Sequence, residues 1–187
     1  MAAVSFTQYY DLEHYLFTEV TARFQRVGTL NAFDFFCIVI WKANRAKTRV
    51  AKRLLTHGHA DLDTAVAALL NEIGHAESPC AQLAVLIERW GFRLPMASAI
   101  LTVLYPNQFT IYDVRVCDVL GDFHDAQNRT KYSKLWERYV AFLAAVREAV
   151  PSESLLRNKD RFLWGQSFAS QLQRDVSNAF STYTREP

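Results

Sequence analysis

The chain has 187 residues, of which half are hydrophobic and 21% are charged. This composition supplies a packed core and excludes an intrinsically disordered chain. Lys and Arg total 21 against 19 Asp and Glu, so the net charge is only +2 and any basic surface must be local. The length is typical of one domain, and we expect residues 1–187 to fold as a single domain.

Cysteine usage and the N-terminal sequence predict a cytoplasmic protein. Cys37, Cys80 and Cys117 are widely spaced and form neither a disulfide framework nor a CxxC clip, which favours a reducing compartment. Residues 1–17 carry acids where a secretory signal needs a basic start and an apolar run. The longest uncharged stretch, residues 94–112, contains two prolines and several polar side chains, so we expect no membrane-spanning segment.

Apolar residues recur at helical spacing along nearly the whole chain. Glycines, prolines and capping residues divide this pattern into segments of helical length. The predicted helices cover residues 7–27, 31–57, 61–74, 78–90, 94–105, 113–120, 132–150, 154–163 and 166–183. Only residues 109–112 are predicted to be extended, and there is no Asn-Gly or Asp-Gly hairpin signal. The sequence therefore predicts an all-α fold with many short helices.

A basic run lies at residues 41–55, WKANRAKTRVAKRLL, where six Lys and Arg residues occur without an acid among them. Lys42, Arg45, Arg49, Lys52 and Arg53 share one face of a helix, and an apolar stripe adjoins that face. Such a ridge suits a nucleic-acid backbone, because each neutralised phosphate releases counterions. The alternative is an ordinary solvated face with surface charges.

A second informative segment, residues 88–121, contains a tight turn at Gly91, a helix of small residues and an uncharged connector. Asp113 follows the connector and opens the next predicted helix. Free N–H groups and the helix dipole stabilise a carboxylate at this position. Taken alone, a carboxylate at this position is more typical of an ordinary N-cap.

Together the two segments resemble the helix-hairpin-helix DNA glycosylase superfamily, of the endonuclease III, adenine glycosylase and 8-oxoguanine glycosylase type. In that family an apolar helix leads into a Ser-Ala-Gln element and a basic helical run; here FDFFCIVIW leads into Lys42-Ala43-Asn44 and the basic run. The family's Leu-x-Gly-Val-Gly-x-Lys-Thr-Ala hairpin and Val-Asp-Thr-His-Val motif match RWGFRLPMASAIL and FTIYDVRVCDVLG in order. The resemblance covers roughly residues 30–121, with the hairpin at 88–104. It implies a two-lobed helical fold that residues 1–29 and 122–187 complete.

The resemblance places Asp113 at the family's catalytic aspartate and Gly91 at the first hairpin glycine. Arg93 takes the place of the second glycine, and Arg115 replaces a histidine of the motif. The lysine that bifunctional members use as a nucleophile falls at Pro95 or Met96, which carry no amine. The four-cysteine iron–sulfur loop is absent, because no cysteine follows Cys117. The resemblance therefore implies a monofunctional glycosylase without a cofactor.

Its implied substrate is double-stranded DNA that contains a damaged or modified base, with modified phage DNA as one candidate. Asp113 would stabilise the positive charge that develops on the sugar and would orient the attacking water. Extruding the base from the stack costs a few kcal/mol. The DNA-binding residues implied by position are Lys42, Asn44, Arg45, Arg49, Gly91, Arg93 and Arg115, with Asn44 or Arg45 filling the gap in the duplex. The implied base pocket contains Trp41, Tyr112 and Trp164.

Other interpretations remain open at this point. A DNA-binding module could keep the fold without the chemistry, and an α-helical protein-interaction domain would have no nucleic-acid role. His57, His59, His75 and Cys80 lack metal-site spacing, so we expect no metal. An aromatic and basic patch at residues 157–168 is expected to close the pocket with Trp164. Its aromatic residues are also interpretable as core residues of an amphipathic helix. We expect a monomer.

Overall fold

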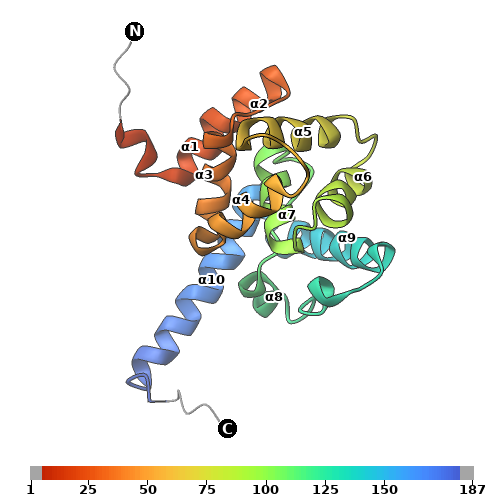
Figure 1. Ribbon diagram of the computed structural model, residues 1–187. Coiled ribbons are helices and arrows are strands. Elements are labelled where there is room, and N and C mark those ends of the chain that lie inside the picture. The colour runs from red at the N-terminus through yellow and green to blue at the C-terminus, as the bar shows by residue number, and fades with distance from the viewer. Residues whose placement is uncertain (1–5, 182–187) are drawn as a thin grey trace.

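The computed structural model describes residues 6–181 (Figure 1), and over this range the chain forms helices and no strand. The prediction of an all-α fold is confirmed. The α-helices are α1 Leu12–Tyr15, α2 Thr21–Val27, α3 Ala32–Ala43, α4 Lys47–Leu55, α5 Leu62–Gly74, α6 Pro79–Ala84, α7 Leu94–Leu104, α8 Val114–Leu120, α9 Tyr132–Ala149 and α10 Leu156–Ser177. Shorter 3₁₀ or π-helical segments are η1 Phe6–Tyr9, η2 Leu16–Val20, η3 Asn44–Ala46, η4 Val85–Arg89 and η5 Ala126–Asn128.

Side-chain caps explain why three of these helices begin where the sequence predicts. Asn31, Asp61 and Ser78 each accept a hydrogen bond from the backbone N–H three residues later. Each cap satisfies one of the N–H groups that a helix start leaves without an intrahelical partner. Pro79 then occupies the first helical position of α6, where its missing N–H has no consequence.

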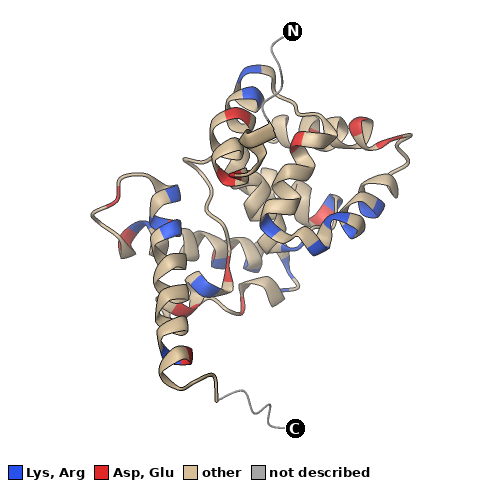
Figure 2. Ribbon diagram, turned by 90° about the vertical axis from the view of Figure 1, so that its left-hand side faces the viewer, with Lys and Arg blue, Asp and Glu red and all other residues tan. Residues whose placement is uncertain are grey.

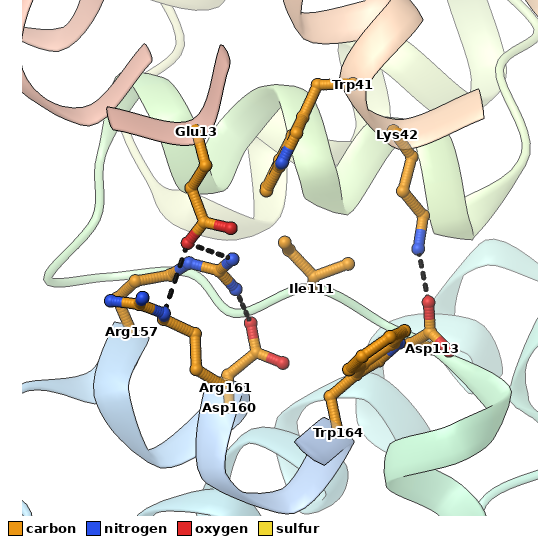
Figure 3. Close-up of a pocket in the computed structure, with 9 residues that line it drawn as sticks. All are labelled: Glu13, Trp41, Lys42, Ile111, Asp113, Arg157, Asp160, Arg161 and Trp164. Atoms are coloured by element: carbon orange, nitrogen blue, oxygen red, sulfur yellow. Dashed lines mark hydrogen bonds and ion pairs between the residues drawn. The ribbon is translucent and has the colours of Figure 1, made fainter. Parts of the chain in front are cut away.

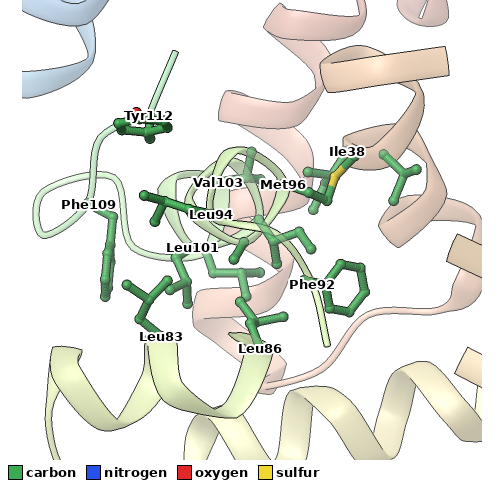
Figure 4. Close-up of a cluster of buried hydrophobic side chains, with 14 of the residues drawn as sticks. Ile38, Leu83, Leu86, Phe92, Leu94, Met96, Leu101, Val103, Phe109 and Tyr112 are labelled. Atoms are coloured by element: carbon green, nitrogen blue, oxygen red, sulfur yellow. The ribbon is translucent and has the colours of Figure 1, made fainter. Parts of the chain in front are cut away.

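The centre of the molecule is α7, which is buried along its whole length apart from Pro95. Figure 4 shows apolar side chains from α3, α6, η4 and the segment after α7 packed around it. Ala97, Ser98 and Ala99 are small enough for neighbouring helices to approach the α7 backbone closely. The uncharged stretch at 94–112 is therefore the core of the fold. Within residues 6–181, no helix is both long and apolar enough to cross a membrane.

Three predicted helix boundaries are wrong. The predicted helix 31–57 is broken after Ala43, whose φ of −162° leaves the helical region, and η3 then turns the chain into α4. Because of the bend, Val50 and Leu54 of α4 are buried in the same core as the apolar face of α3. The predicted helix 7–27 is interrupted before Asp11, which caps α1. These two differences arise from capping and packing, which the spacing of apolar residues does not report.

The third difference lies near the C-terminus, where the predicted helices 154–163 and 166–183 are one helix, α10, running through Gly165. A glycine inside a helix costs only about 1 kcal/mol relative to alanine, so it does not force a break. The last two residues of the prediction, 182 and 183, lie outside the described residues. α10 packs on α8 and α9, and its last turns extend away from the body (Figure 1).

Candidate functional site

The connector between α7 and α8 is held in the core by Tyr112. Its backbone N–H donates to Ser98 Oγ at 2.9 Å, and its hydroxyl donates to the Phe123 carbonyl at 2.7 Å. The ring is only 2% exposed, so Tyr112 does not line a cavity and the expectation that it belongs to a base pocket is wrong. Alternation along the extended connector explains this, because neighbouring side chains of an extended segment point in opposite directions. Tyr112 faces the core, and Asp113 faces outward.

Asp113 caps α8 and at the same time contacts the end of α3. Its Oδ1 accepts a hydrogen bond from the Arg115 backbone N–H at 3.1 Å. Its Oδ2 lies 2.6 Å from Lys42 Nζ, across 71 residues of sequence. The two side chains are 21% and 15% exposed, so the pair is partly shielded from water. The structure thus brings together the two sequence segments that the resemblance singled out.

A cavity of about 450 Å³ opens beside this ion pair (Figure 3). Trp41 of α3 and Trp164 of α10, both expected to contact a base, line it together with Ile111 of the connector. Figure 3 shows the two indole rings on different walls of the cavity, with the Asp113 carboxylate near Trp164. The remaining lining residues are the charged side chains Glu13, Lys42, Asp113, Arg157, Asp160 and Arg161.

Four of these charged residues form an ion-pair network, and three of them lie in the patch 157–168 that was expected to close the pocket, although none was named as a site residue. Arg157 contacts both Glu13 Oε1, at 2.8 Å, and Asp160 Oδ2, and Arg161 also approaches Glu13. The Arg157 guanidinium lies over the Trp41 ring, 5.2 Å from its centroid, as in a cation–π contact. Burial raises the pKa of Asp160 to about 6, against the opposing effect of Arg157.

A basic groove with a volume of about 500 Å³ lies next to the cavity. Its charged lining comes from both predicted segments: Lys42, Arg49 and Arg53 from the basic run, and Arg93 from the turn after Trp90. Lys42 lines the cavity as well, so it stands at the junction of the two depressions. Figure 2 shows several Lys and Arg positions gathered on neighbouring helical turns at mid-height, with both signs of charge distributed over the rest of the molecule.

Gly91 forms one edge of the groove in a conformation that favours glycine. Its φ is +65°, and a Cβ added there would lie 3.0 Å from Arg53 Nη1. The Arg53 guanidinium can therefore lie against Gly91 because Gly91 has no side chain. The same guanidinium lies 5.9 Å from the Phe92 ring centroid. The basic helix α4 and the turn at Gly91 thus form one surface.

Three of the expected DNA-binding residues line neither depression. Asn44 and Arg45 are exposed on η3, where Asn44 Oδ1 accepts a hydrogen bond from Lys47 Nζ. Arg115 is directed toward α10: its Nη1 donates to Gln171 Oε1, and its guanidinium lies over Trp164 at 5.4 Å. Arg115 therefore positions the indole that lines the cavity instead of projecting into the groove.

The histidines have a structural explanation. His57 stacks on Trp90 with a centroid distance of 4.1 Å, and His59 lies parallel to the same ring at 5.9 Å. Trp90 Nε1 donates to Glu72 Oε2, which fixes the indole between α5 and the turn at Gly91. Among residues 6–181, no group of three His, Cys, Asp or Glu side chains is arranged to hold a metal ion.

Comparison with protein families, curated proteins and solved structures finds no match to this chain. The cavity and the groove are therefore the features of this chain that bear on its function.

Proposed function

We propose that the protein is a DNA glycosylase-like enzyme that hydrolyses the N-glycosidic bond of a damaged or modified base. The observation that carries this proposal is the Lys42–Asp113 ion pair, which stands where an aromatic-lined cavity meets a basic groove. The groove offers phosphate contacts, the cavity offers space for an extruded base, and the carboxylate lies between them. A volume of about 450 Å³ is in the range of small-molecule sites.

The chemistry follows from the charge that develops during bond cleavage. As the bond between C1′ and the base nitrogen lengthens, positive charge accumulates on the deoxyribose. A carboxylate beside the sugar stabilises that charge and accepts a proton from the water that attacks C1′. Asp113 supplies this carboxylate. Trp41 and Trp164 provide stacking surfaces for the base that leaves the duplex.

We further propose that the cavity lies between two lobes. Residues 30–121 contribute Trp41, Lys42, Ile111 and Asp113, whereas the flanking segments contribute Glu13 and the α10 residues. This division matches the part of the chain that resembles the glycosylase family and the part that would complete the fold. The positions of the family's nucleophilic lysine, Pro95 or Met96, carry no amine. Lys42 Nζ is engaged with Asp113, so we assign it to charge and phosphate contacts and the reaction to the monofunctional class.

The test is base release from duplex DNA that contains uracil, hypoxanthine, 8-oxoguanine or 7-methylguanine, and from phage DNA that contains hydroxymethylcytosine. We expect the protein to release at least one of these bases and to leave an abasic site that breaks only in alkali. Asp113→Asn should lower the release rate by about 10²- to 10⁴-fold while DNA binding changes little. The matched control is Asp118→Asn, on the exposed side of the same helix, which should retain activity.

The second candidate function is a DNA-binding module without catalysis. The basic groove favours it, because Arg49, Arg53, Gly91 and Arg93 form the groove without any contribution from Asp113. Tight DNA binding by the protein together with no base release from any of these substrates would support the module and contradict the enzyme. Strand scission by the protein alone would contradict the monofunctional assignment.

A further inference from the structure

A second carboxylate, Asp160, faces the same cavity from α10. The residue is 2% exposed, and Arg157 Nη1 donates to its Oδ2. Within the described part of the chain, no hydrogen bond involves the other oxygen, Oδ1. Figure 3 shows that oxygen on the side of Trp164 and Asp113, directed into the cavity. This oxygen is therefore presented to whatever enters the cavity.

The two cavity carboxylates stand in different surroundings. The Asp113 side chain is 21% exposed and is paired with Lys42. The Asp160 side chain is 3% exposed and shares its partner, Arg157, with Glu13. Burial raises the pKa of Asp160 to about 6, and the charge of Asp113 adds to the increase; Arg157 and Lys42 oppose it. A buried acid with a raised pKa, facing a substrate-sized cavity, is the pattern of a general acid.

The positions of the two groups assign them to different ends of the substrate. Asp113 contacts Lys42, which also lines the basic groove, so Asp113 lies on the sugar and phosphate side. Asp160 is paired with Arg157, which lines the cavity but not the groove, so it lies on the side of the extruded base. Trp164, one turn further along α10, provides the stacking surface beside it.

We propose that Asp160 is the general acid that protonates the departing base, which makes bases with a neutral ring the substrate class of this cavity. This inference rests on the proposed function. As the bond between C1′ and the base nitrogen breaks, its electron pair goes to the base. The Asp160 carboxyl donates its proton to a ring nitrogen or carbonyl oxygen of the base. Water then bonds to C1′ and gives its proton to Asp113, which passes it to solvent, and solvent returns a proton to Asp160.

The experiment compares two leaving groups in single-turnover reactions. Hypoxanthine, uracil and 8-oxoguanine leave as anions unless they are protonated, whereas 7-methylguanine already carries a positive charge and leaves as a neutral molecule. We expect Asp160→Asn to slow release of the neutral bases that the wild type cleaves by about 10²- to 10⁴-fold. Release of 7-methylguanine should change by less than about threefold. Asp175→Asn, on the distal part of α10, is the matched control.

The pH profile of the wild type tests the same proposal without a variant. The charged and titratable groups that act on Asp160 are Glu13, Lys42, Asp113, Tyr139, Arg157 and Arg161. The proton donor is lost above its pKa of about 6, so release of a neutral base should fall about tenfold for each pH unit above that value. Release of 7-methylguanine should lack this decrease.

The outcomes separate the two proposals. If the wild type releases no base, the proposed function fails and Asp160 has no reaction to serve. If neutral bases are released equally well by Asp160→Asn, or if both leaving groups slow down equally, the general-acid role is overturned and the proposed function stands. If the wild type releases 7-methylguanine and no neutral base, the general-acid role is also overturned, because 7-methylguanine leaves without a proton from the protein.

Discussion

Asp160 occupies the most buried environment of the three acids that line the cavity. Its side chain is 3% exposed, against 21% for Asp113 and 32% for Glu13. Removing a carboxylate from water is unfavourable unless charges and hydrogen bonds replace the lost hydration. Arg157 replaces only part of it, because that guanidinium also serves Glu13. The consequence is a carboxyl group that is more readily protonated in the folded protein than in the unfolded chain.

This difference links protein stability to pH. The folded-state pKa of Asp160 is about 6, above the ordinary value of 3.8. The stabilisation from proton binding is therefore fully present below pH 3.8 and is lost as the pH rises through about 6. We expect the unfolding free energy of Asp160→Asn, relative to the wild type, to increase by up to about 3 kcal/mol between pH 4 and pH 7. Urea unfolding at several pH values measures this, and parallel curves for the two proteins would contradict it.

At the residue scale, the sequence predicted which residues line the cavity better than it predicted how deeply each one is buried. Lys42, Trp41, Asp113 and Trp164 were named from the sequence, and all four line the cavity. Asp160 lies in the patch 157–168 that was expected to close the pocket, but it was not named itself, because the pattern of that patch is aromatic and basic. Only the packing of α10 against α8 and α9 buries it. The same limit explains Tyr112, whose direction depends on the alternation of the extended connector.

At the scale of elements, helix boundaries set by local interactions were predictable, whereas boundaries set by tertiary packing were not. Helix starts at Asn31, Asp61 and Ser78 were predictable because a cap is a short-range interaction. The break after Ala43 was not, because it serves the simultaneous burial of α3 and α4 against one core. The turn at Gly91 combines both kinds of information, since the glycine is visible in the sequence and its contact with Arg53 is not.

Two glycine substitutions separate backbone strain from the Arg53 contact. Gly91 and Gly58 both have positive φ, at +65° and +83°, but a Cβ at Gly58 would meet no atom within 4 Å. We expect Gly91→Ala and Gly58→Ala each to lower the unfolding free energy by about 1–2 kcal/mol. Only Gly91→Ala should also weaken DNA binding, because its Cβ displaces the Arg53 guanidinium from the groove. Equal DNA affinities for the two variants would contradict the groove assignment.

At the scale of the whole molecule, a chain with a net charge of only +2 has, within residues 6–181, one groove that four cations and no acid line. The groove is assembled from the α3–α4 bend and the turn before α7, which are about 40 residues apart in sequence. Family resemblance predicted that these segments meet, and composition alone would not have done so. Acidic residues elsewhere balance the total charge, so overall charge is a poor indicator of this surface.

The salt dependence of DNA binding measures how many groove cations contact phosphates. Each neutralised phosphate contributes about −0.9 to the slope of log affinity against log salt concentration, so Lys42, Arg49, Arg53 and Arg93 together predict a slope of about −3 to −4. Arg93→Gln should make the slope shallower by about 1. Arg129→Gln is the control, because Arg129 is paired with Asp125 and lines a separate depression. Anisotropy titrations between 50 and 200 mM salt, the range over which such contacts lose affinity steeply, provide the slopes. A steeper effect of Arg129→Gln than of Arg93→Gln would place the DNA on a different face and remove Asp113 from the sugar.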